Sequence, residues 1–218
     1  MNDLELIATV ASASVRAALA AGGGPKTPTP LNTPAPKPPR REPVPVDHDR
    51  LAVAVHESGH LIASVVAGAE VITAIVGDLP GGFKGLTTYF SDTIPAHREM
   101  EISYAGPWSE ARFRAGRRPT QRDLFDVFAG NGCRDAATLG LAGGTHLGAD
   151  VVPLLDRCWP AVLAVAKKLY SDGEATQADA CSALGITDGG GYTSVQLASL
   201  RSGGRTVPAF GTRTPTPA

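Results

Sequence analysis

Residues 51–67 read LAVAVHESGHLIASVVA, a largely apolar segment in the first half of the chain. Apolar residues surround its polar centre on nearly every side, and a helix that is apolar all round is buried in a protein core. Asp47 or Asp49 can cap such a helix at its start, and Gly68 can end it. We therefore expect a buried helix that runs to about Ala67 and forms the centre of the domain.

The polar centre of this helix, HESGH at residues 56–60, fits the pattern HExxH. Residues four apart lie one turn above each other on one helix face, so His56 and His60 can direct imidazole nitrogens at one metal ion. Glu57 then lies beside the metal, where its carboxylate can act as a general base. Two exposed histidines on a helix surface would be the alternative, but the apolar surroundings favour burial, and buried polar groups need partners.

The pattern supplies two ligands, whereas catalytic zinc usually has three protein ligands and an open position. Spacing alone does not choose the third ligand. The candidates are Asp123, Asp126, Asp135, Glu110, His146 and Asp150. Asp123 also has a purely structural interpretation, because Thr120-x-x-Asp123 fits a helix capping box.

The rest of the domain is predicted to be mainly α-helical with one small β-hairpin, an α+β fold. A β-branched strand at Val71–Val76 and a second strand at Gly85–Phe90 would be joined by the turn DLPGG. The predicted helices cover residues 95–115, with a kink or restart at Gly106-Pro107, and residues 120–129, 150–170 and 176–184.

Four segments, in order, resemble the peptidase domain of the FtsH-like ATP-dependent zinc proteases. VAVHESGHLIASVVAGAEV carries the HExGH form of the motif, and VITAIVGDLPGGFKGLTTYF is similar to that family's hairpin. ISYAGPWSEARF resembles the helix with an AGxxAE-like signature, in which Glu110 takes the place of the glutamate. PTQRDLFDV resembles the segment whose aspartate-leucine pair supplies the third zinc ligand.

This resemblance, over about residues 50–185, implies a zincin-like metallopeptidase with a zinc ion as cofactor. It implies that Asp123, followed by Leu124, is the third ligand beside His56 and His60, with Asp126 as its main rival. Glu110 could orient a metal-binding histidine from outside the ligand set. No nucleotide-binding motif occurs in the sequence, so we expect cleavage without ATP.

Composition limits the partners that the chain can have. Its 20 basic and 21 acidic residues give a net charge of −1, which provides no general attraction to nucleic acid or anionic lipid. The arginines at 112–122 read as a solvated helical face. Residues 51–69 could span a bilayer by length, but their histidines and glutamate would be penalised there. Three scattered cysteines fit reduced thiols in a cytoplasm. We expect a cytoplasmic protein that acts on a protein or peptide substrate, without nucleic acid or membrane.

Four regions are expected along the chain: a short helix within residues 1–24, a Pro-rich flexible linker at 25–45, the domain at 46–200 and a flexible tail at 201–218. The predicted function is that of a zinc-dependent peptidase, a metalloendopeptidase that cuts flexible or unfolded protein segments. Two alternatives stay open. One is a zinc-binding regulatory or adaptor protein with weak catalysis, and the other is a helical interaction module without metal.

Overall fold

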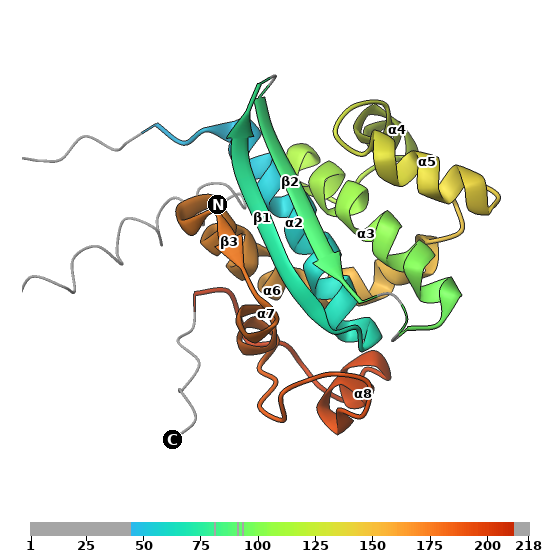
Figure 1. Cartoon of the computed structure of the whole chain (residues 1–218), viewed down its shortest axis with the longest axis vertical. Coiled ribbons are helices and arrows are strands. Elements are labelled where there is room, and N and C mark those ends of the chain that lie inside the picture. The colour runs from blue at the N-terminus through green and yellow to red at the C-terminus, as the bar shows by residue number, and fades with distance from the viewer. Residues whose placement is uncertain (1–44, 81, 91, 93, 212–218) are drawn as a thin grey trace, which may run out of the picture.

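A computed structural model of the chain describes residues 45–211, except residues 81, 91 and 93 (Figure 1). The predicted N-terminal helix and nearly all of the predicted linker therefore lie outside the described residues. Within the described part, the domain is mainly helical and has a small antiparallel sheet, as the sequence predicts.

The central element is helix α2, His48–Ala67. Asp47 caps it, because its side chain accepts hydrogen bonds from the backbone N–H groups of Asp49 and Arg50. Gly68 ends it in the left-handed conformation, with φ 94°. Every residue from Leu51 to Val66 is buried. The expected buried helix is confirmed.

The sheet covers one side of α2 (Figure 1). Strand β1, Val71–Leu79, pairs with β2, Gly82–Tyr89, as an antiparallel hairpin, and the short β3, Glu174–Ala175, pairs with the other edge of β1. The hairpin was expected from the sequence, and β3 was not. The strand order β2-β1-β3 leaves β1 in the middle and β2 at an edge.

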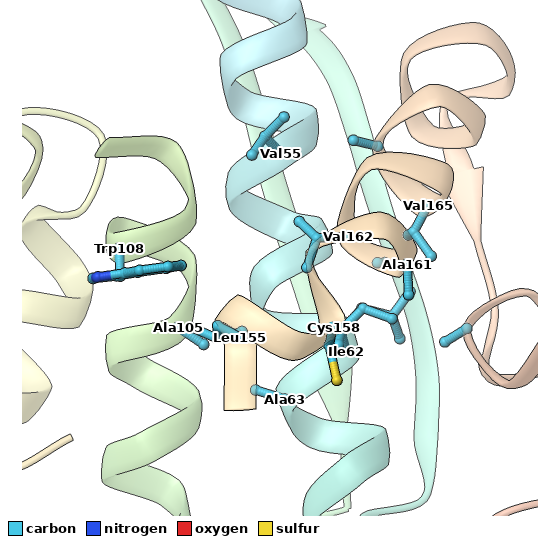
Figure 2. Close-up of a cluster of buried hydrophobic side chains, with 14 of the residues drawn as sticks. Val55, Ile62, Ala63, Ala105, Trp108, Leu155, Cys158, Ala161, Val162 and Val165 are labelled. Atoms are coloured by element: carbon cyan, nitrogen blue, oxygen red, sulfur yellow. The ribbon is translucent and has the colours of Figure 1, made fainter. Parts of the chain in front are cut away.

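Two long helices enclose the rest of α2: α3, Ala96–Ala115, and α6, Val152–Asp172. Figure 2 shows side chains of all three helices meeting in the core. Pro107 lies inside α3, which runs as one helix without the restart that was one of the two expectations at Gly106-Pro107. We attribute this continuity to tertiary packing, because α3 lies along both α2 and a later helix, α5, Cys133–Ala142.

Shorter helices complete the domain. They are α4, Gln121–Ala129, α5, Cys133–Ala142, the 3-10 turn η2, Ala149–Val151, α7, Gln177–Leu184, and α8, Val195–Arg201. Helices α4 and α7 were predicted, whereas α5 and α8 were not.

The chain beyond α8 differs from the expected flexible tail as far as it is described. Val207 and Phe210 pack against the core, and Arg205 donates a hydrogen bond to the carbonyl of Gly185. The packed domain therefore extends past residue 200. Among the described residues, no helix combines the length and the apolar character that a membrane crossing requires.

The closest approach of α2 to α3 depends on Gly59. A Cβ atom there would lie 2.5 Å from the carbonyl oxygen of Ala105 and 2.6 Å from Oγ of Ser109. We expect Gly59→Ala to destabilise the domain by about 1–3 kcal/mol, because overpacking outweighs the better helix propensity of alanine.

Gly140 is the matched control for this substitution. It lies exposed within α5, and an added Cβ would meet nothing within 4 Å. Gly140→Ala should stabilise the domain by up to about 1 kcal/mol, since only propensity changes. Urea denaturation measures both effects, and a stabilising Gly59→Ala would contradict the described helix contact.

Candidate metal centre

The two histidines of α2 face each other one turn apart, as their spacing predicts. His56 Nε2 and His60 Nε2 are 3.1 Å apart, and both side chains are buried. Their neighbour Glu57 is also buried, with 6% of its surface exposed. The structure therefore brings the three predicted residues of the motif into one enclosed region.

The third member of the group comes from α5. The Asp135 carboxylate spans both rings, with one oxygen 3.1 Å from His56 Nε2 and the other 3.3 Å from His60 Nε2. Tetrahedral ligands at about 2.05 Å from a zinc ion lie about 3.3 Å from one another. The two nitrogens and the carboxylate oxygens thus lie almost at zinc-ligand spacing. Among the histidine, cysteine, aspartate and glutamate side chains of the described residues, His56, His60 and Asp135 form the single group of three or more that lies close enough to hold a metal ion.

Asp123, the ligand that the family resemblance implies, does not belong to this group of His56, His60 and Asp135. It occupies the first turn of α4, where one carboxylate oxygen accepts hydrogen bonds from the backbone N–H and the hydroxyl of Thr120, both at 2.7 Å. Arg117 approaches the same oxygen at 3.0 Å. Asp123 is the acid of a complete capping box, so the structural interpretation of Thr120-x-x-Asp123 is the one observed.

The other candidate ligands also lie outside the histidine group. Asp126 is exposed on α4 and borders a hollow between α3 and α4. His146 lies in the turn before η2, and Asp150 lies in η2 itself. Asp135 was one of six candidates by spacing. It could not be preferred, because the short, small-residue helix that carries it was not recognised.

Glu110 of α3 orients His56 from behind the metal group. One of its oxygens lies 2.9 Å from His56 Nδ1, and Glu110 is 1% exposed. Its other oxygen accepts hydrogen bonds from Arg114 Nε at 2.7 Å and Asn131 Nδ2 at 3.0 Å. Because an ionised carboxylate only accepts, the proton of a neutral His56 ring lies on Nδ1, and Nε2 keeps its lone pair for a metal.

His60 is oriented in the same way by the backbone of α3. Its Nδ1 lies 2.8 Å from the carbonyl oxygen of Ile102, which can only accept, so Nδ1 carries the proton. Gly106, one turn further along α3, leaves room for the ring, because a Cβ there would overlap the imidazole. Both histidines therefore present Nε2 to the same point as Asp135.

Glu57 points towards the hairpin. The hydroxyl of Thr87, on β2, lies 2.7 Å from Glu57 Oε2 and 3.2 Å from the Glu57 backbone oxygen. Neither Thr87 nor Asn131 was expected from the sequence, and Arg114 was expected only as part of a solvated basic face. A threonine in a strand and a polar residue between two helices carry no pattern that sets them apart.

The charges of the group are strongly coupled. Burial disfavours the charged ring of His56 and by itself lowers its pKa, but hydrogen bonds with Asp135 and Glu110 outweigh burial and raise the pKa from 6.5 to about 10. Burial likewise opposes a charged His60, yet Asp135 raises the pKa of that ring. Burial also opposes ionisation of Asp135, but the two histidines lower the pKa of its carboxyl well below the usual range. Without a metal, the His56 ring is therefore positively charged at neutral pH, with a proton on each ring nitrogen.

The predicted basic face is largely paired in the structure. Arg112 forms an ion pair with Asp156 and stacks over the ring of Trp159 at 4.3 Å, and Arg117 pairs with Asp123. Arg112 and Arg117 are therefore paired with acidic and aromatic side chains of the same chain.

Comparison with known proteins adds no family assignment. Neither a protein-family model nor a curated protein sequence matches this chain at a significant level. Functional inference therefore rests on the geometry of the group formed by His56, His60 and Asp135.

The choice between the two aspartates can be tested by zinc titration. Asp135→Asn removes a charged oxygen ligand and should weaken zinc binding by at least the roughly tenfold to hundredfold that loss of an outer partner causes. Asp123→Asn and Asp126→Asn should leave the affinity unchanged, although Asp123→Asn weakens a helix cap. Loss of zinc in Asp123→Asn alone would restore the ligand that the resemblance implies.

Zinc binding should displace protons, because the histidines must become neutral to bind the metal. His56, whose pKa is raised to about 10, is protonated at pH 7 in the metal-free protein. Titration calorimetry in buffers of different ionisation enthalpy should show release of about one proton or more per zinc near pH 7, and weaker binding at lower pH. A binding enthalpy that is independent of the buffer would contradict this charge state.

Proposed function

We propose that this protein is a zinc-dependent peptidase whose metal is held by His56, His60 and Asp135. The observation that carries the proposal is the convergence of these three side chains at zinc-ligand spacing, with the Glu57 carboxylate near enough to interact electrostatically with both rings. Two imidazoles and one carboxylate are a donor set that suits catalytic zinc, which keeps one position open for water or substrate.

The donor set also argues against a purely structural zinc site. Structural sites usually have four protein ligands, and cysteines are common among them. Cys133 lies exposed at the start of α5, and it is not part of the metal-binding group. Three ligands and an adjacent base are the arrangement that hydrolysis needs.

The roles of the residues follow from their positions. A bound zinc ion supplies Lewis acidity towards a water molecule and a peptide carbonyl. Glu57 accepts the proton of the attacking water and passes it to the leaving amine, as a general base and then a general acid. Glu110 and the Ile102 carbonyl hold the two rings so that Nε2 faces the metal.

An extended peptide would fit along β2. The predicted strand Val71–Val76 belongs to β1, which lies between β2 and β3 and is less open to a substrate strand. β2 is an edge strand of the sheet formed by the described residues, and its Thr87 contacts Glu57. A substrate strand added to this edge would pass close to the base, and backbone pairing of this kind requires flexible or unfolded segments.

Glu57→Gln tests the proposal with the zinc content of the purified protein as its control. The substitution keeps the shape of the side chain and removes the base, so zinc should stay at one ion per chain while casein cleavage falls by about 10²-fold or more. Cleavage by the unmodified protein should be inhibited by a chelator and should not need ATP.

Two results would point to the alternatives. Stoichiometric zinc with no cleavage by the unmodified protein would favour a zinc-binding regulatory protein. Protein without bound metal even after zinc is supplied would favour an interaction module.

A further inference from the structure

We infer that strand β2 positions the base, through a hydrogen bond from Thr87 to Glu57 and through the space left by Gly85. This inference rests on the proposed function, because it gives the strand a part in the same reaction. Thr87 is a positioning residue and does not touch the reacting atoms.

The contact of Thr87 with Glu57 is short, and the single hydroxyl proton of Thr87 is directed at Glu57 Oε2, the nearer of two acceptors. Thr87 Oγ1 is 2.7 Å from Glu57 Oε2, a distance typical of a hydroxyl that donates to a carboxylate, and 3.2 Å from the Glu57 backbone oxygen. Threonine is β-branched, so few χ1 rotamers are open to it, and its strand is held by pairing with β1. The hydroxyl is therefore a fixed point against which the flexible glutamate side chain is held.

Gly85, two residues before Thr87, borders the same carboxylate. Side chains two apart in a strand share a face, so positions 85 and 87 both face α2. A Cβ at Gly85 would overlap Cγ, Cδ and Oε1 of Glu57. The φ angle of Gly85 is not positive. The glycine is therefore needed there for space and not for an unusual backbone conformation.

Together, Thr87 and Gly85 place the two carboxylate oxygens of Glu57 in different surroundings. Oε2 is held by the hydroxyl, whereas Oε1 lies against Gly85, which contributes no side chain of its own. Oε1 is then the atom left to accept a proton from water. Because Thr87 acts on the base and not on substrate binding, its loss should lower kcat and leave KM nearly unchanged.

The test compares three variants at saturating zinc. Thr87→Val keeps the shape and removes the hydroxyl, and kcat should fall by roughly tenfold, a part of the full contribution of a general base, with KM within about twofold. Thr87→Ser restores the hydroxyl and should recover most of kcat. Thr88→Val is the matched control, since Thr88 pairs with Thr73 on the opposite face of the same strand, and kcat should stay unchanged. An unchanged kcat in Thr87→Val, with active unmodified protein, would overturn the inference.

A second pair of variants tests the space at Gly85. Gly85→Ala should reduce kcat by displacing Glu57, whereas Gly77→Ala on β1, where a Cβ would meet nothing within 4 Å, should not. Equal activity of the two variants would contradict the role given to Gly85.

A measurement without turnover separates this inference from the proposed function. In metal-free protein, Thr87→Val should lower the urea midpoint more when Glu57 is present than in a Glu57→Ala background, because the hydrogen bond couples the two residues. Equal shifts in the two backgrounds would show that the contact does not exist. If the unmodified protein neither binds zinc nor cleaves casein, the role of Glu57 as a base is lost with the proposed function, and the midpoints still decide whether Thr87 holds its carboxylate.

Discussion

Two histidines and a glutamate are buried in the central apolar helix α2, and their need for hydrogen-bond partners shapes the packing around them. A buried polar group without a partner destabilises a fold by several kcal/mol, so His56, Glu57 and His60 must each be hydrogen-bonded. Three different elements supply these partners: α3 through Glu110 and a backbone carbonyl, α5 through an aspartate, and β2 through a hydroxyl. The elements around α2 are therefore arranged for its polar centre as well as for its apolar surface.

Helix α3 shows how packing and the metal group depend on each other. Its close approach to α2 is possible because Gly59 and Gly106 lack side chains at the contact, and that approach brings the Ile102 carbonyl within 2.8 Å of His60 Nδ1. The same helix carries Glu110, whose remaining oxygen is held by an arginine and an asparagine. A change that separates α2 from α3 would thus disturb the ring orientations, even without touching a ligand.

The sequence predicted most of what local patterns encode. The central helix, the hairpin, the capping box at Thr120 and the pairing of His56 with His60 follow from periodicity, capping and spacing, and all are observed. The third ligand does not follow from such patterns, because the contact of Asp135 with the histidines spans 79 residues of chain and depends on how α5 packs against α3. The resemblance pointed to Asp123, whose carboxylate is instead used by its own helix. Likewise, Thr87 gains its role from strand pairing that brings it to Glu57.

The position of the metal is the most direct test, and crystals grown with one equivalent of zinc would provide it. Diffraction recorded on both sides of the zinc absorption edge should give one anomalous peak, about 2.0–2.1 Å from Nε2 of His56 and of His60 and about 2.0–2.2 Å from a carboxylate oxygen of Asp135. The Glu57 carboxylate should lie beside that peak without binding it. A peak at Asp123, or no peak at the two histidines, would contradict the proposed metal centre and the peptidase function built on it.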